Sequence, residues 1–167
     1  MLNLHGYSDL DYAPDLVDRK SISGNAFFLG TGAISWSSKK QNTISLSSTE
    51  VEYKALTTSA CESIWLQRCL QELCFYASGQ PTPILCDNTS AEALAKNPVM
   101  HQRTKHIEVR EHFIREKVQS GDISLHHCNT KENVVDIFTK ALGKELFFKH
   151  RSALGMMELP LREGVEQ

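Results

Sequence analysis

The chain has 167 residues, of which 41% are hydrophobic and 23% are charged, so it suits one globular domain with a single core. The formal net charge of −2 does not indicate a nucleic-acid-binding protein, and any site for a polyanion would have to be local. The sequence has no run of about 18 apolar residues and no signal-peptide pattern, so we expect neither a membrane span nor secretion. Five cysteines without a Cys-x-x-Cys spacing predict reduced thiols in an intracellular protein, in the cytoplasm or the nucleus.

The N-terminal part of the chain predicts three strands joined by tight turns, over residues 2–8, 23–29 and 33–37. The first of these alternates apolar and polar residues and ends at Asp9. Gly30, Thr31 and Gly32 form a hairpin turn between the second and the third. A polar connection at 38–42, which contains Lys39 and Lys40, and a possible strand extension at 43–46 follow.

The rest of the chain alternates helices with strands. A long helix is expected over 50–77, because neither proline nor glycine interrupts it. A strand at 83–86 ends at Asp87, and a second short strand is expected at 123–127. Further helices are predicted over residues 90–96, 106–120, 132–142 and 144–154. Hairpin strands followed by such an alternation predict an α/β fold, a mixed sheet covered by helices.

Two glutamates at the start of the long helix point in different directions. At about 100° per residue, six mostly apolar residues lie on one arc of the helix: Ala55, Leu56, Ser59, Leu66, Leu70 and Leu73. Glu52 lies near the middle of this arc and Glu50 nearly opposite, toward water. An inward carboxylate needs a partner or a metal ion. For a lone glutamate, capping or a salt bridge is the simpler interpretation.

Three further acids change that interpretation. Asp9 and Asp87 terminate strands, where α/β sheets place ligands, and Asp136 lies on a helix with apolar neighbours. Four converging carboxylates repel one another, and divalent cations relieve the repulsion. Oxygen ligands favour Mg²⁺ or Mn²⁺, and two such ions about 4 Å apart are suited to phosphoryl displacement. Each acid alone is weak evidence, since strand-end aspartates are also common turn formers.

Seven short motifs, taken together in order, carry a resemblance to a known family. They are Gly6-Tyr7-Ser8-Asp9, Asp18-Arg19-Lys20-Ser21, Ile34-Ser35-Trp36-Ser37-Ser38-Lys39-Lys40-Gln41, Ser47-Ser48-Thr49-Glu50-Val51-Glu52-Tyr53, Cys86-Asp87-Asn88, Arg103-Thr104-Lys105-His106-Ile107 and Asp136-Ile137-Phe138-Thr139-Lys140-Ala141-Leu142. The set resembles the ribonuclease H domain of copia-type LTR-retrotransposon polyproteins, over roughly residues 4–155.

The resemblance implies the ribonuclease H-like fold, a five-stranded mixed sheet with the first three strands antiparallel and helices on both faces. It implies cleavage of the RNA strand of RNA–DNA hybrids with two Mg²⁺ or Mn²⁺ ions, and a reverse transcriptase domain as a possible partner. The family's acidic tetrad maps onto Asp9, Glu52, Asp87 and Asp136. Glu52 fits better than Glu50, because an apolar residue follows it and Ala55 lies three positions on.

Seven further residues are predicted to contact the substrate, each with a structural alternative. Asn88 and Ser90 are suited to a phosphate or a 2′-hydroxyl, and helix capping is an equal possibility. Lys39 and Lys40 are suited to the nucleic-acid backbone, although a solvated turn is slightly favoured. Arg103, Lys105 and His106 form a basic cluster suited to phosphates, or to a structural role at a helix entry.

The sequence therefore predicts one ribonuclease H-like domain over residues 1–157 and a disordered tail over 158–167, with no membrane partner. Its expected function is metal-dependent cleavage of the RNA strand of hybrids. Two alternatives stay open at this point: a domesticated module that binds nucleic acid or protein without cutting, and a DNA-cutting recombinase on the same fold. The intact set of four acids argues against the binding module, and the order of strands and helices together with the full set of motifs favours the ribonuclease over the recombinase.

Overall fold

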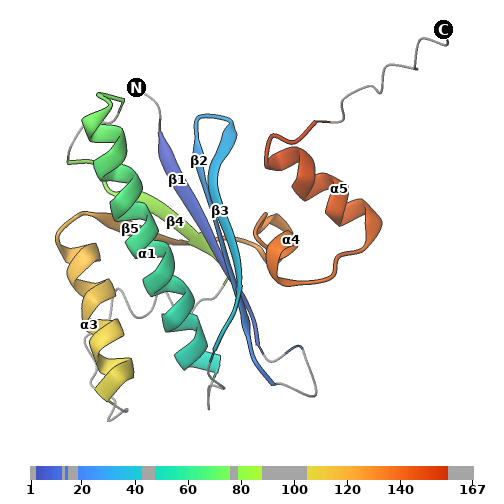
Figure 1. Cartoon of the computed structure of the whole chain (residues 1–167), viewed down its shortest axis with the longest axis horizontal. Helices are drawn as coiled ribbons and strands as arrows, with labels where there is room; N and C mark the ends of the chain where they lie inside the picture. The colour runs from blue at the N-terminus through green and yellow to red at the C-terminus, as the bar shows by residue number, and fades with distance from the viewer. Residues whose placement is uncertain are drawn as a thin grey trace, which may run out of the picture.

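The computed structural model describes residues 3–12, 14, 19–42, 48–75, 79–87 and 105–157. Within these residues five strands form one sheet: β1 (Leu4–Asp11), β2 (Ile22–Leu29), β3 (Gly32–Lys40), β4 (Thr82–Cys86) and β5 (Ile123–His127). The order across the sheet is β3-β2-β1-β4-β5 (Figure 1). β1, β2 and β3 are antiparallel neighbours, whereas β4 runs parallel to β1 and β5. The predicted mixed sheet is therefore confirmed.

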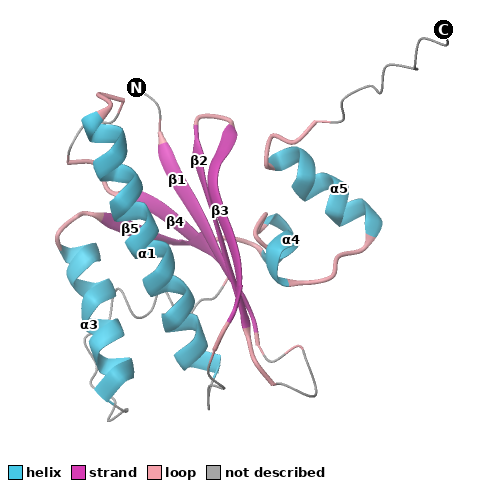
Figure 2. Cartoon of the chain, viewed as in Figure 1, coloured by secondary structure: helices cyan, strands magenta, loops and turns pink. Residues whose placement is uncertain are grey.

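Helices cover both faces of this sheet, as predicted (Figure 2). The long α1 (Ser48–Glu72) and α3 (Lys105–Gln119) lie side by side on one face. The short α4 (Asp136–Thr139) and α5 (Lys144–Ala153) lie on the other, and a single 3-10 turn, η1 (Thr130–Glu132), leads into α4. No helix in the described part of the chain is both long and apolar enough to cross a membrane.

The alternation of β2 builds a core on each face of the sheet. Phe27 packs in the cluster under α1, whereas Ala26 and Phe28 pack against residues of the α4 and α5 side. Phe27 is fully buried, and its burial stabilises the folded state by about 1.5–3 kcal/mol. Gly6, its neighbour on β1, leaves the space for this ring, because a Cβ at Gly6 would lie 2.4 Å from Phe27 Cε1.

Helix α1 buries the predicted arc but ends five residues early. Five of the arc residues are buried, namely Ala55, Leu56, Ser59, Leu66 and Leu70. Leu73 is 62% exposed and lies beyond the helix. Cys74 takes a positive φ of 59°, and the N–H groups of Cys74 and Phe75 donate to the carbonyls of Gln71 and Leu70. This is a Schellman C-cap, and the sequence does not indicate it because no glycine stands at that position.

Two other predicted boundaries are wrong. β1 continues to Asp11, so Asp9 lies inside the strand, and β3 continues to Lys40, so Lys39 and Lys40 are strand residues and not a connection. Both extensions follow from the pairing of β2 with its two neighbours, which keeps Ile22 opposite Asp11 and Lys40.

The predicted helix at 132–142 is broken into η1 and the four-residue α4. The side chain of buried Asn133 causes the break: its Oδ1 accepts from the N–H of Val135, and its Nδ2 donates to the carbonyl of Ser8. The strands at 83–86 and 123–127 and the helices at 106–120 and 144–154 agree with the structure to within a residue. The expected elements at 43–46 and 90–96 and the tail at 158–167 lie outside the described residues.

Candidate metal centre

Three aspartates from distant parts of the chain meet at one end of the sheet. Asp9 comes from β1, Asp87 directly follows β4, and Asp136 is the first residue of α4. Because β1 and β4 are parallel neighbours, their carboxyl ends reach the same edge of the sheet. One carboxylate oxygen of each lies within 4.8 Å of the others. Asp9 and Asp136 are buried and Asp87 is half-buried.

Glu52 faces a pocket next to this group. Its side chain is half-buried on α1. Among the described residues, the group of three close carboxylates is Asp9, Asp87 and Asp136, without Glu52. The pocket lies between α1 and the ends of β1 and β4, and its lining residues are Ser8, Asp9, Leu10, Glu52, Ala55, Leu56, Cys86 and Asp87. The predicted inward direction of Glu52 therefore agrees with the structure.

A buried hydrogen bond fixes α1 against β1 beside this pocket. Ser59 Oγ donates to Ser8 Oγ over 3.0 Å, one residue before Asp9, and also lies 3.0 Å from the carbonyl oxygen of Ala55. Both serines are buried. The bond sets the level of Glu52 on the helix relative to Asp9 on the strand, because Glu52 lies two turns before Ser59.

Two uncharged side chains donate hydrogen bonds to the Asp9 carboxylate. Thr139 Oγ1 donates to Asp9 Oδ2, and Asn133 Nδ2 donates to Asp9 Oδ1 over 3.5 Å. Asn133 is fully buried and Thr139 is 5% exposed. Donors of this kind fix the direction of a buried carboxylate.

A lysine contacts two of the three aspartates. Lys140 Nζ lies 2.9 Å from Asp136 Oδ1 and 3.4 Å from Asp9 Oδ1. It follows α4 directly, four residues after Asp136, and it caps the helix through its own N–H. Burial opposes the charge of Lys140, but the hydrogen bond to Asp136 and the carboxylates of Asp9, Asp136 and Asp87 raise its pKa above the usual value.

The crowding of acids affects the ionisable groups around it. Burial raises the pKa of Asp136 to about 6; Lys140 opposes this shift and Asp9 adds to it. Burial also raises the pKa of the Cys128 thiol to about 12, and Asp87 contributes. For Asp11, burial first and then Asp9 raise the pKa, against the effect of Lys140. Burial is the main cause in each case and a neighbouring carboxylate adds to it, and a cation bound among these acids would offset that repulsion.

The donor set fits a hard divalent cation. Asp9, Asp87 and Asp136 offer carboxylate oxygens, with Glu52 across the adjacent pocket, and neither histidine nor cysteine belongs to the three-residue group found among the described residues. All-oxygen ligands suit Mg²⁺ or Mn²⁺ better than Zn²⁺. This arrangement can hold cations next to a phosphodiester that enters from the open side of the pocket.

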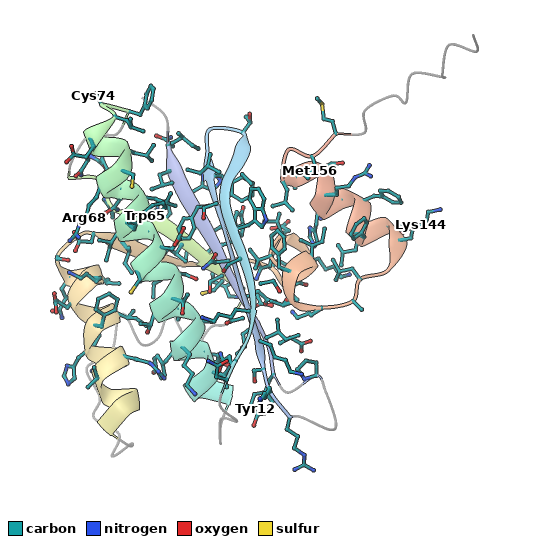
Figure 3. The ribbon with its side chains drawn as sticks, in the orientation of Figure 1. Tyr12, Trp65, Arg68, Cys74, Lys144 and Met156 are labelled. Atoms are coloured by element: carbon teal, nitrogen blue, oxygen red, sulfur yellow. The ribbon has the colours of Figure 1, made fainter. Side chains whose placement is uncertain are left out.

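The predicted substrate residues are only partly described. Lys39 and Lys40 lie opposite Ser23 and Ile22, which pair in turn with Leu10 and Asp11. These two lysines therefore lie at the same end of the sheet as Asp9, two strands away, and both are exposed. Figure 3 marks that end by Tyr12, which directly follows β1. The residues Asn88, Ser90 and Arg103 and the side chains of Lys105 and His106 lie outside the described part.

Three residues at this site were not predicted: Asn133, Thr139 and Lys140. The spacing of four between Asp136 and Lys140 is typical of a helical ion pair and could have indicated one. Thr139 belongs to the same motif, but nothing in the sequence indicates that its hydroxyl reaches Asp9. Asn133 is an ordinary loop asparagine until the fold brings it against β1.

The chain is similar to parts of two transposon polyproteins, although no protein-family model matches it. The retrovirus-related Pol polyprotein from transposon RE1 of Arabidopsis thaliana is 42% identical over 159 residues, which are 95% of this chain and 11% of the relative. That from transposon TNT 1-94 of Nicotiana tabacum is 43% identical over 153 residues, 92% of the chain and 11% of the relative. The chain thus spans only 11% of the length of these relatives.

Three solved structures share the arrangement of strands and helices. LC11-RNase H1, in complex with RNA/DNA hybrid, has a TM-score of 0.60 at 12% identity and covers 82% of this chain and 94% of its own. RNase H1 of the archaeon Halobacterium salinarum has a TM-score of 0.57 at 14% identity, with the same coverage. The foamy viral protease-reverse transcriptase, in complex with RNA/DNA hybrid, has a TM-score of 0.54 at 14% identity and covers 83% and 19%. At these identities the likeness is one of fold.

Proposed function

Because the chain is homologous to one segment of the retrovirus-related Pol polyproteins of copia-type transposons and has the ribonuclease H fold, we propose that it cleaves the RNA strand of RNA–DNA hybrids. The observation that carries this proposal is the meeting of Asp9, Asp87 and Asp136 within 4.8 Å. Residues 1–157 form the catalytic domain in this proposal.

The four acids share one task in the proposed reaction. Asp9, Asp87, Asp136 and Glu52 hold two Mg²⁺ or Mn²⁺ ions, and the strands and helices that carry them set their positions. Such ions, when bound, activate water and stabilise the leaving oxygen of a phosphodiester. Asn133 and Thr139 keep the Asp9 carboxylate in a fixed direction, so that the ligand does not have to reorganise.

The substrate path follows from the position of the basic residues. Lys39 and Lys40 lie at the end of the sheet that carries Asp9, where their ammonium groups can contact backbone phosphates. Asn88, Ser90, Arg103, Lys105 and His106 are proposed to contact the same hybrid. A reverse transcriptase domain is the proposed partner, in keeping with the Pol polyprotein relatives.

A cleavage assay tests the proposal against its two alternatives. The purified protein is incubated with labelled RNA–DNA hybrid, duplex RNA and duplex DNA, with Mg²⁺, with Mn²⁺ or with chelator. We expect cutting of the RNA strand of the hybrid alone, no cutting with chelator, and none by Asp87→Asn. Equal cutting of duplex DNA would support the recombinase instead. Binding of hybrid without cutting under any of these conditions would support the binding module.

A further inference from the structure

Lys140 places an ammonium group among the aspartates. Its Nζ lies 2.9 Å from Asp136 Oδ1 and 3.4 Å from each of Asp9 Oδ1 and Oδ2. The side chains of Asp9 and Asp136 are 1% and 5% exposed, whereas that of Lys140 is 29% exposed. The ammonium therefore contacts two buried carboxylates while its own side chain stays partly open to the solvent.

The backbone fixes Lys140 while the side chain keeps a route outward. The residue directly follows α4 in an extended conformation, and its N–H donates to the carbonyl of Asp136 over 2.9 Å. The long flexible stem of a lysine can carry its charged head toward water while the backbone stays in place. Removal of the ammonium from the aspartates therefore needs no change in α4.

An ammonium and a divalent cation would compete for the same oxygen atoms. Both oxygens of Asp9 and one of Asp136 are contacted by Nζ. The carboxylates of Asp9, Asp87 and Asp136 repel one another when no cation lies among them. Lys140 supplies one positive charge there. A divalent cation has twice that charge and coordinates the oxygens directly, so it would offset the repulsion between the carboxylates more fully.

We propose that Lys140 is the resident counter-ion of this acid cluster, which neutralises the aspartates in the absence of metal and has to move out before a divalent cation binds. The inference rests on the proposed function in that it takes these aspartates as the metal ligands. It has two opposite consequences. Lys140 stabilises the cation-free fold, and it lowers the affinity of the site for divalent cations, whereas a salt bridge with a purely structural role would do only the first.

The test compares Lys140→Met with wild type and with Lys149→Met. Methionine keeps much of the length of the stem and removes the charge. Lys149 is an exposed lysine of α5 that donates to the carbonyl of Lys131, so its variant controls for the removal of one surface charge. Melting is followed with chelator, and Mn²⁺ binding is followed by calorimetry and by electron paramagnetic resonance.

We expect Lys140→Met to melt about 2–4 °C lower with chelator. We also expect it to bind Mn²⁺ about tenfold more tightly than wild type, since a partly buried competing charge is gone. Lys149→Met should match wild type in both measurements. Unchanged or weaker Mn²⁺ binding by Lys140→Met would overturn the inference.

A charge-retaining variant covers the case in which Lys140→Met does not fold. Lys140→Arg keeps the positive charge and can grip carboxylates with two donors, so it should bind Mn²⁺ no more tightly than wild type. Tighter binding by this variant would overturn the inference.

The outcome is separable from that of the cleavage assay. Wild type that binds Mn²⁺ without cutting hybrid would overturn the proposed function and leave this comparison intact. Binding by Lys140→Met alone would support the inference and would describe a native site closed by its own lysine. The absence of Mn²⁺ binding in both proteins would overturn it.

Discussion

Unlike the three aspartates, Glu52 lies on the long helix α1 and faces the site across a pocket. Two residues apart on a helix, Glu50 and Glu52 point about 200° apart, so only one can face that pocket, and Glu52 lines it. Glu52→Gln should therefore lower the rate of hybrid cleavage by several orders of magnitude, since it would remove a charged ligand of the proposed metal ions.

Glu50→Gln is the matched variant for this measurement. We expect it to keep most of the activity and to lose about 0.3–1 kcal/mol of helix stability through the missing charge in the first turn. Both variants are assayed at saturating Mg²⁺, with melting curves recorded in parallel. An inactive Glu50→Gln together with an active Glu52→Gln would mean that the tetrad has to be reassigned.

Asp136 predicts a specific pH dependence of the cation-free protein. Burial raises its pKa from 3.8 in the unfolded chain to about 6 in the folded one. Ionised Asp136 therefore destabilises the fold above about pH 6, and this cost disappears as the pH falls toward 3.8 and the carboxyl takes up its proton. With chelator present, Asp136→Asn should melt above wild type at pH 7.5, and the difference should shrink as the pH is lowered through this window.

The same titration also separates two roles of Asp136. A wild type more stable than Asp136→Asn at pH 7.5 would contradict the prediction and would make the ion pair with Lys140 the dominant interaction of this residue. Denaturant melts at each pH, with the same chelator concentration, give the comparison directly.

At the level of elements, the position of α4 depends on a glycine in β2. A Cβ on Gly24 would lie 2.9 Å from the side-chain atoms of both Val135 and Thr139. Gly24 is also the pairing partner of Asp9. The absence of a side chain at Gly24 thus lets α4 approach the sheet closely enough for Asp136 to meet Asp9.

Gly24→Ala should therefore push α4 away from the sheet. We expect the free energy of unfolding to fall by about 1–3 kcal/mol, as is typical of an overpacked core, and the Mn²⁺ affinity to fall by more than unfolding alone would cause. Gly32→Ala is the control, because a Cβ there meets nothing within 4 Å. Equal behaviour of the two variants would show that the packing of α4 on β2 does not position the site.

For the molecule as a whole, the net charge of −2 makes any attraction to nucleic acid a local matter. Lys39 and Lys40 lie at the sheet end that carries Asp9, and their joint replacement by glutamine should weaken hybrid binding. The slope of log affinity against log salt should become shallower by about 0.7–0.9 for each phosphate that the variant no longer binds.

The control replaces two lysines at another place on the surface. Lys144 and Lys149 lie on α5, and Figure 3 shows Lys144 at the outer edge of the molecule. Glutamine at both positions changes the net charge equally and should leave the slope as it is. An unchanged slope in the Lys39 and Lys40 variant would remove this end of β3 from the interface.

The sequence by itself determined the fold and the family. The hairpin strands, the long helix and the later alternation of strands and helices predicted the mixed sheet, and the comparisons confirm the resemblance of the motifs to Pol polyproteins. Local patterns suffice for this because period and turn chemistry act between near neighbours. The direction of Glu52 could be predicted for the same reason, since it follows from the position of a residue on one helix.

Only the tertiary structure decided how the site is held. The early end of α1 depends on a positive φ at Cys74, and the break before α4 depends on Asn133 reaching Ser8, more than a hundred residues away. Thr139 and Lys140 became part of the site because α4 packs against β2 and turns both side chains toward Asp9. These interactions join residues far apart in the chain, so their free energies depend on packing that no local pattern records.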